Sequence, residues 1–449
     1  MEKRVYIKTY GCQMNERESE GLAATLRNHG YEITDDEHSA EIILLNTCSV
    51  REQAEAKAIG KSNFISRGKN QGKLVGILGC MAQNFGETLY QKSPNTRLVV
   101  GPDGLGRIPE YLDRLMGDKN RRITDIEVRP LDRKFTSARD EKKVKASLFV
   151  SIMRGCNMRC TYCIVPKTRG SEQYRPMEDI IREIQWLAER GTREVTLLGQ
   201  IVNNYGTHQI PFIGGKSPFV QLLEKIQAIE GIRRIRFMSP HPKGFKSDLI
   251  DAYENLPKLC PHVHLPLQSG SDRILKAMKR PYKREQFSSI VAALGEKIPT
   301  ISISTDIIVG FPGENEEDFE ATCAVFDEIK FDMAFIFKYS PRPGTIAENF
   351  GDQISQEIKE ARNQILLKKV EYYSRQYNES MVGTVKEILV ERRARRGLQQ
   401  FEGYTPEHRK VIFTATEDLI GQLISVKIEG CTTSTLLGKF IPSQVAGEA

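Results

Sequence analysis

The chain has 449 residues, which is enough for about three domains of ordinary size. Its 65 Lys and Arg against 58 Asp and Glu leave a formal net charge of +7, a mild excess that is compatible with nucleic acid but does not by itself indicate it. No apolar signal segment opens the sequence and no stretch approaches the ~18 apolar residues of a membrane span, which predicts a cytoplasmic protein without a membrane part.

The first part of the chain repeats one unit three times: a strand, a loop that contains a Cys, and a helix. Strands are predicted at 4–10, 41–46 and 74–79, and the loops after them contain Cys12, Cys48 and Cys80. Parallel strands end at one edge of their sheet, where such sheets bind ligands. A single Cys there is often a small buried side chain, but three in register, beside the motif described below, predict a three-thiolate iron–sulfur site with one open iron.

A basic linker is predicted between the first domain, at 3–118, and the second. The linker covers 119–141, and the wider span 118–145 contains ten Lys or Arg against six Asp or Glu. A solvated linker is the simpler explanation, and contact with a phosphate backbone is the alternative.

Cys156, Cys160 and Cys163 stand in C-x3-C-x2-C spacing directly after a predicted strand at 147–153. A [4Fe-4S] cluster takes four ligands, so three thiolates on a short loop leave one iron free to chelate a small molecule. A structural zinc site is the alternative, but it needs a fourth Cys or His nearby. None occurs in the forty residues that follow Cys163, and the spacing therefore favours an iron–sulfur cluster.

Strands and helices alternate over 142–375, which is predicted to be the central domain. Six βα units predict an open, partial barrel, and such barrels bind ligands at the carboxyl rim of their strands. His241, just after the third of these strands, is a candidate substrate contact. A helix N-cap explains some rim residues equally well, notably Ser271 and Asp272. The better candidate ligand contacts at the strand ends are Gln200, Ser239, Gln268 and Asp306.

The last domain, at 378–442, is predicted to be a small antiparallel β-barrel, because its short strands are broken by glycines. Arg392, Arg393, Arg395 and Arg396 crowd one hairpin tip. This cluster predicts that the barrel binds the phosphate backbone of RNA. The alternative is that the Arg side chains of this tip are only solvated. Cys260, Cys323 and Cys431 have no partner spacing and are predicted to be packing residues.

The motif around Cys156, with Tyr162 before its last Cys, resembles that of the radical S-adenosylmethionine (SAM) enzymes. Over nearly its whole length the chain is similar to one family among them, the methylthiotransferases, which combine an N-terminal cluster domain, a radical SAM core and a C-terminal TRAM domain. The stretches that carry the resemblance lie at 11–15, 46–51, 160–163, 168–170, 264–272 and 310–314.

This resemblance implies two [4Fe-4S] clusters and two SAM molecules per turnover. One cluster is expected on Cys12, Cys48 and Cys80, where one SAM donates a methyl group to an associated sulfur. The other is expected at the Cys156 motif, where the second SAM becomes the radical that removes hydrogen from C2 of an adenine. No further catalytic residue is predicted. With SAM as the ligand, the expected contacts are Tyr162, Gln200, Ser239, Gln268 and Asp306.

The substrate that the resemblance implies is N6-(dimethylallyl)adenosine at position 37 of tRNA, next to the anticodon, and the product is its 2-methylthio derivative. The expected partners are this tRNA and an electron donor such as flavodoxin or ferredoxin, and the expected state is a monomer. A methylthiotransferase acting on a ribosomal protein side chain or on threonylcarbamoyladenosine in tRNA stays open as an alternative. A non-catalytic iron–sulfur RNA-binding protein is a further one.

The proposed chemistry has a geometric requirement. An aryl C–H bond has no acidity for base chemistry, so a radical is needed, and the sulfur source must lie within contact distance of the activated carbon. We therefore expect the carboxyl edge of the first domain's sheet to face the mouth of the central barrel.

Overall fold

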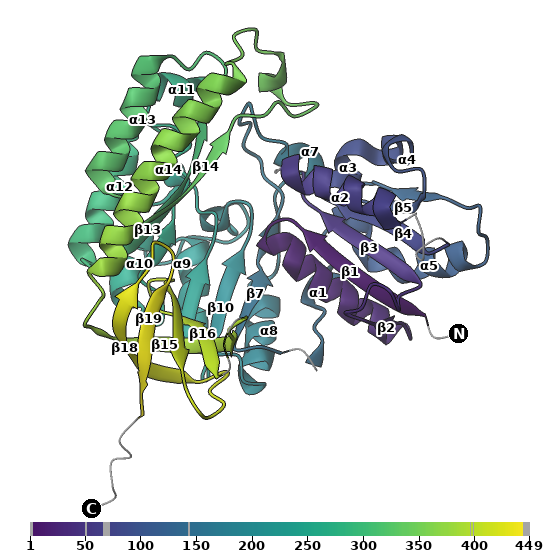
Figure 1. Cartoon of the computed structure of the whole chain (residues 1–449), viewed down its shortest axis with the longest axis horizontal. Coiled ribbons are helices and arrows are strands. Elements are labelled where there is room, and N and C mark those ends of the chain that lie inside the picture. The colour runs from purple at the N-terminus through teal and green to yellow at the C-terminus, as the bar shows by residue number, and fades with distance from the viewer. Residues whose placement is uncertain are drawn as a thin grey trace, which may run out of the picture.

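The computed structural model describes residues 3–49, 52–65, 72–141, 144–395, 397 and 399–442. Figure 1 shows an N-terminal α/β domain (purple to blue) beside the central domain, and a C-terminal β-barrel (yellow) at one end of the central domain. The predicted fold class, a parallel-sheet domain followed by a partial barrel and a small antiparallel barrel, is confirmed. Across the described ranges, none of the helices combines the length and the apolar character needed to cross a bilayer.

The N-terminal domain is built on a six-stranded parallel sheet with the order β2-β1-β3-β4-β5-β6. Its central strands β3 and β4 are buried along their whole length, as expected of apolar strands that are covered on both faces. The strands are β1 (Arg4–Tyr10), β2 (Glu32–Ile33), β3 (Ile42–Thr47), β4 (Leu74–Gly79), β5 (Thr96–Val100) and β6 (Ile123–Asp125). The helices are α1 (Gln13–Asn28), α2 (Glu52–Ile65), α3 (Cys80–Phe85), α4 (Leu89–Lys92) and α5 (Ile108–Met116).

The segment predicted as a linker, 119–141, is partly built into the domains that it joins. β6 pairs with β5 at the edge of the first sheet, and the short helix α6 (Arg133–Ser137) packs on α1. Arg139 forms ion pairs with Glu20 and Glu183 and is almost fully buried. Part of the basic excess therefore stabilises the contact between domains and does not face solvent.

Glu183, on helix α8 (Met177–Glu189), is the centre of this contact. Its carboxylate lies 2.7 Å from Arg139, 2.6 Å from Arg175 and 3.7 Å from Arg17, and all four side chains are buried. Burial alone would raise the pKa of Glu183, but the three guanidinium groups hold it below its usual range. Since Arg17 belongs to α1, this buried network fixes the N-terminal domain against the central one.

The central domain has six parallel strands in two sheets, β7-β10-β11 and β12-β13-β14. A bridge between Ile235 and Leu259 connects the sheets just before β12 begins. The strands are β7 (Ser147–Ser151), β10 (Glu194–Leu198), β11 (Arg234–Phe237), β12 (His262–His264), β13 (Ser302–Val309) and β14 (Met333–Lys338). The helices around them, besides α8, are α9 (Pro218–Gln227), α10 (Ser247–Asn255), α11 (Asp272–Ala277), α12 (Arg284–Lys297), α13 (Glu316–Ile329) and α14 (Gln356–Glu379).

The C-terminal domain is a closed barrel with the strand order β15-β16-β17-β19-β18. It docks on the amino-terminal ends of the central strands: Arg234 donates to the carbonyls of Tyr404 and Glu387, and Arg236 to that of Thr405, each at 2.8 Å. The barrel thus closes the end of the central domain that lies opposite the carboxyl rim. Its strands are β15 (Val385–Arg393), β16 (Gln400–Tyr404), β17 (Lys410–Thr414), β18 (Leu423–Cys431) and β19 (Leu436–Ile441).

Glu391 of β15 makes the stability of this interface depend on pH. Burial, together with the nearby charge of Glu194, raises the pKa of Glu391 to about 7. A carboxyl whose pKa is higher in the folded state than in the unfolded state stabilises the fold at low pH, and this contribution is lost as the pH rises from about 4.5 to about 7. We therefore expect Glu391→Gln to raise the free energy of unfolding by about 2 kcal/mol at pH 8 and to change it little at pH 5.

Urea unfolding at the two pH values measures this difference. The exposed Glu417, for which the structure shows no partner among the described residues, provides the control Glu417→Gln, which is expected to have no effect at either pH. Equal stabilisation by Glu391→Gln at pH 5 and pH 8 would contradict the assignment.

Candidate metal centre

The first three Cys follow the carboxyl ends of adjacent strands, as predicted. Cys12 immediately precedes α1, Cys48 follows β3, and Cys80 is the first residue of α3. The Cys48 amide donates to the carbonyl of Tyr10 at 2.8 Å, which brings the first two loops together. A Cβ added to Gly11 would lie 2.9 Å from that of Cys48, so the close approach of these loops requires glycine at position 11.

Two buried Asn side chains hold these loops in place. Asn15 donates to the side-chain oxygen of Asn46 at 3.2 Å, and Asn46 donates back to the Asn15 carbonyl at 2.9 Å. The Cys12 thiol donates to the Asn15 side chain at 3.3 Å. The sequence analysis assigned no role to either Asn, although both stand in the stretches that carry the family resemblance.

The thiols of the first triad have different acidities. A hydrogen bond with Cys48 lowers the pKa of Cys12 to about 6, and the positive charge of Arg169 acts in the same direction. Burial raises the pKa of Cys80 despite the neighbouring Arg169. Because the thiolate is the form that binds metal, Arg169 favours the ligating form of both residues.

The second triad occupies the loop between β7 and α7 (Val165–Arg169), beside a short antiparallel ribbon of β8 (Met153–Arg154) and β9 (Gln173–Tyr174). Gly155, just before Cys156, has φ +81, and an added Cβ would lie 2.0 Å from the Ser171 carbonyl oxygen. Only glycine therefore fits at this entry to the loop. Burial raises the pKa of Cys156 to about 11 and that of Cys163 to about 12.

Arg280 is a neighbour of the second triad that the sequence analysis missed. Its Nη1 lies 3.7 Å from the Cys160 sulfur, and its Nε lies 3.0 Å from the Tyr282 hydroxyl oxygen. The side chain reaches the triad from beyond the end of α11, about 120 residues along the chain. No spacing signal connects Arg280 to the Cys motif, and only the tertiary structure reveals the pair.

Arg169 links the segment that follows the second triad to the first triad. It ends α7, six residues after Cys163, and its Nε donates to the Cys80 sulfur at 3.1 Å. Its other nitrogens form an ion pair with Glu18 of α1, and the Arg169 side chain is almost fully buried. The expectation that the carboxyl edge of the first sheet faces the mouth of the central barrel is therefore confirmed.

The donor set of each triad fits an iron–sulfur cluster. Ligands of one tetrahedral Zn ion lie within about 4 Å of one another, because each Zn–S bond is about 2.3 Å long. Among the described residues, no three His, Cys, Asp or Glu side chains form such a single-ion arrangement. Three thiolates are the ligands that a [4Fe-4S] cluster with one open iron would take, and the guanidinium groups of Arg169 and Arg280 would offset part of their negative charge.

Two of the predicted SAM contacts, Gln200 and Ser239, follow the ends of β10 and β11, whereas Asp306, predicted at a strand end, lies inside β13, which continues to Val309. The side-chain oxygen of Gln200, Oε1, accepts a hydrogen bond from the backbone amide of Gly155 at 2.6 Å, so Gln200 also holds the cysteine loop in place. Asp306 lies on β13 with its carboxylate 3.3 Å from Nε2 of His264. Ser239 follows β11 with φ 61, a left-handed conformation that is uncommon outside glycine.

Gln268 has the same unusual backbone, with φ 73. The backbone N–H of Gln268 donates to the backbone carbonyl of Asp306 at 2.8 Å, and this hydrogen bond connects the segment after β12 to β13. Left-handed non-glycine residues cost of order 1 kcal/mol each and concentrate at ligand sites. The strain at Ser239 and Gln268 therefore supports the predicted ligand site at this rim.

Tyr162, a predicted SAM contact, and His241, a candidate substrate contact, are the two remaining predicted residues of this site. Tyr162 packs into an aromatic cluster, with its ring edge-on to Phe311 at 6.5 Å. His241 is buried, and its Nδ1 accepts from the Lys243 amide at 3.1 Å, so Nε2 carries the proton. Within the part of the chain that the structure describes, His241 Nε2 has no hydrogen-bond partner. A buried donor without an acceptor is costly, and a ligand oxygen or nitrogen would satisfy it.

In the Arg cluster predicted at the hairpin tip of the C-terminal barrel, two of the side chains form ion pairs within the protein. Arg392 forms an ion pair with Glu402, and Arg393 lies 3.3 Å from Asp418. Arg395 is exposed, and Arg396 lies outside the described residues. Their predicted role in RNA binding remains a prediction.

Three family models match successive parts of the chain. The Uncharacterized protein family UPF0004 matches residues 4–101, the Radical SAM superfamily matches 150–326, and the TRAM domain matches 379–441.

Two relatives that match nearly the full chain are both named tRNA-2-methylthio-N(6)-dimethylallyladenosine synthase. The relative from Opitutus terrae is 48% identical over 99% of this chain and 99% of its own length. The relative from Akkermansia muciniphila is 45% identical over 98% of this chain and 99% of its own length.

Among solved structures, the chain is similar to the radical S-adenosylmethionine methyltransferase TsrM from Kitasatospora setae, with cobalamin and a [4Fe-4S] cluster bound. The TM-score is 0.56, with 14% identity, over 78% of this chain and 74% of that one. At this identity the similarity concerns the fold alone.

Proposed function

The chain belongs to the methylthiotransferase family of radical SAM enzymes, and we propose that it transfers a methylthio group to C2 of N6-(dimethylallyl)adenosine next to the anticodon of tRNA. Its full-length relatives are named for this synthesis. The observation that supports the proposal is the contact of Arg169 with Cys80, because it brings the helix that follows the second Cys loop against the first triad. A radical centre and a sulfur source can act on one carbon only if they share a site.

We propose two [4Fe-4S] clusters, one held by Cys12, Cys48 and Cys80 and the other by Cys156, Cys160 and Cys163. When bound, the clusters and SAM supply the radical and the sulfur transfer, which is chemistry of the cofactors. The chain's own residues orient these groups. We propose that SAM binds at the carboxyl rim near Tyr162, Gln200, Ser239, Gln268 and Asp306.

Positive charge and shielding are the main contributions of the protein in this proposal. Arg280 stands beside Cys160, and Arg169 beside Cys80, so each triad has one buried guanidinium to offset the negative charge of its thiolates. The buried network around Glu183 fixes the two domains against each other. Both features favour a site with little water, in which a reactive radical meets only its substrate.

The remaining partners are part of the same proposal. The TRAM barrel is proposed to contact tRNA, in part through Arg395, which has no partner among the described residues. Reduction of the clusters requires a small electron-transfer protein such as flavodoxin or ferredoxin. We propose that the enzyme works as a monomer in the cytoplasm.

Nucleoside mass spectrometry tests the proposal. Reconstituted protein is incubated anaerobically with SAM, dithionite and tRNA that carries isopentenyladenosine, and the digested nucleosides are analysed. We expect a product with the mass of the 2-methylthio derivative, and none with tRNA that lacks the isopentenyl group. Cleavage of SAM without a modified nucleoside would refute this substrate and assign the chemistry to a protein side chain or to a differently modified tRNA.

A further inference from the structure

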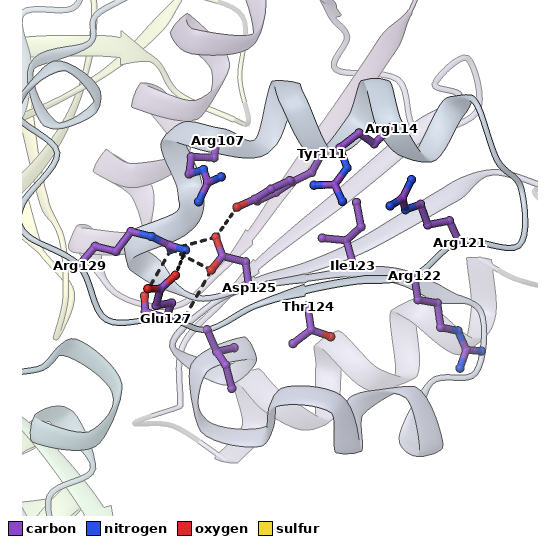
Figure 2. Close-up of a pocket in the computed structure, with 11 residues that line it drawn as sticks. Arg107, Tyr111, Arg114, Arg121, Arg122, Ile123, Thr124, Asp125, Glu127 and Arg129 are labelled. Atoms are coloured by element: carbon purple, nitrogen blue, oxygen red, sulfur yellow. Dashed lines mark hydrogen bonds and ion pairs between the residues drawn. The ribbon is translucent and has the colours of Figure 1, made fainter.

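A cavity of about 610 Å³ lies on the outer edge of the N-terminal sheet, between α5 and the edge strand β6. Figure 2 shows the side chains that surround it, from α5 on one side and from the segment around β6 on the other. We call it the arginine groove, because its lining includes five guanidinium groups: Arg107, Arg114, Arg121, Arg122 and Arg129. The acids in its lining are Asp125 and Glu127.

Part of this positive charge is paired with acidic side chains of the protein itself. Arg129 forms ion pairs with Asp125 and Glu127, and Tyr111 donates its hydroxyl to Asp125 at 2.5 Å. One Arg thus pairs with both acids of the groove, and the five Arg less the two acids leave its lining with a net charge of +3. Arg122 donates to the Pro94 carbonyl at 2.7 Å and keeps its charge.

Arg114 and Arg121 carry the groove's unsatisfied charge. Both side chains are exposed, and over the described ranges neither has an ion pair or a side-chain hydrogen bond. Arg107 lies against the Tyr111 ring at 5.4 Å and is only weakly paired, 3.8 Å from Glu110. Several guanidinium groups around one concave surface, with few acids to balance them, suit a ligand with several negative charges.

One end of the groove lies beside both Cys loops. The Arg129 carbonyl accepts from Arg154 at 3.0 Å, two residues before Cys156. The Ile126 carbonyl accepts from Gln83 at 2.7 Å, three residues after Cys80. Val128 is 62% exposed, and its side chain lies against Gly170, just after Arg169. The segment that ends the groove therefore borders the junction of the two triads.

We propose that the arginine groove binds the sugar–phosphate backbone of the substrate RNA as the strand leaves the catalytic junction. The inference rests on the proposed function, because it takes the reacting nucleoside to lie between the triads. Phosphates repeat along a strand and match the fork geometry of Arg. The exposed Ile126 and Val128 then lie where the strand enters the groove.

An acidic electron-transfer protein is the competing occupant, and the shape of the site argues against it. The charges line a concave groove, and two of the guanidinium groups come from one side of it, Arg114 from α5 and Arg107 from the residue just before α5. A polynucleotide strand can lie in such a groove, whereas the rounded surface of a folded protein meets mainly its rim.

The test compares the double variant Arg114→Gln/Arg121→Gln with wild type, in reconstituted full-length protein. Fluorescence anisotropy gives the Kd for labelled tRNA, with and without the isopentenyl group, over a series of salt concentrations. We expect the variant to bind both RNAs about five- to tenfold more weakly. The slope of log Kd against log salt should fall by roughly 1.5, since two phosphate contacts are lost.

The matched control is Lys225→Gln/Lys368→Gln. It removes the same charge from exposed side chains on α9 and α14 that have no partner among the described residues, and it is expected to leave the Kd within about twofold of wild type. Because phosphate contacts carry no sequence information, the ratio between the two RNAs should stay unchanged in the groove variant.

Three outcomes would overturn the inference. The groove variant could bind RNA with wild-type affinity and salt slope, or lose no more affinity than the control. Alternatively, RNA binding could stay intact while reduction of the clusters by reduced flavodoxin slows, which would assign the groove to the electron donor. Failure of the wild-type protein to bind or modify tRNA would instead refute the proposed function, so the two failures are distinguishable.

Discussion

We expect Cys160→Ala to abolish both SAM cleavage and formation of the methylthio nucleoside, and Cys48→Ala to abolish only the nucleoside product. Cys160 belongs to the loop between β7 and α7, where the proposed cluster would have three thiolate ligands and one iron free to bind SAM. Cys48 belongs to the first domain's sheet and holds the proposed sulfur source. The loss of product should exceed the about 100-fold that removal of an outer-shell partner of a metal site costs.

Two measurements on each variant separate the steps: 5′-deoxyadenosine by chromatography for SAM cleavage, and the modified nucleoside by mass spectrometry. Cys431→Ala is the matched control, since Cys431 lies in the C-terminal barrel and packs against its core. It should retain both activities. If Cys48→Ala still forms the methylthio nucleoside, the first triad is not the sulfur site.

Arg169→Leu should have the second largest effect. The substitution removes the hydrogen bond to Cys80 and leaves Glu18, with 11% of its side chain exposed, without its ion-pair partner. Removal of one partner from a buried pair is strongly destabilising, and loss of an outer-shell group weakens a metal site by about 10- to 100-fold. We expect the variant to lose the iron of one cluster and most of the methylthio product, while SAM cleavage falls less.

Iron content per chain and the midpoint potentials measured by electron paramagnetic resonance show which cluster is affected. Lys167→Leu is the control, because Lys167 stands on the same helix α7 but is exposed. Arg169→Lys keeps the charge without the fork geometry and should fall between wild type and Arg169→Leu. Full iron content together with unchanged potentials in Arg169→Leu would show that Arg169 only docks the domains.

Spacing along the chain was sufficient to find the six ligand candidates. Cys12 follows a strand of alternating apolar and polar residues, Cys48 and Cys80 follow mainly apolar strands, and parallel strands in register end at one edge. The Cys156 loop is local in sequence, so its three thiols converge without any long-range information. Short strands broken by glycines also predicted a small barrel at the carboxyl terminus, and the alternation of strands and helices predicted the six strands of the central domain. The strand β16 and the parallel pairing of β17 with β19 were not predicted.

The linker shows where such local reasoning failed. Residues 123–125 lie in a polar, basic stretch without a clear alternating pattern, yet they form β6 because β5 presents an open edge beside them. The basic excess there looked like one feature in the sequence. The structure divides it between Arg139, which is buried against Glu183, and the arginine groove.

The sequence by itself therefore determined the fold class, the three domains in outline and the residues that carry thiols, because these depend on periodicity and on spacing within short segments. Only the tertiary structure decided which positively charged side chains lie beside the cysteines. Arg169 reaches Cys80 across a domain boundary, and Arg280 reaches Cys160 from the loop between α11 and α12, about 120 residues along the chain. Such pairs form when separate elements pack together, and no local pattern encodes the distance between side chains that far apart in the chain.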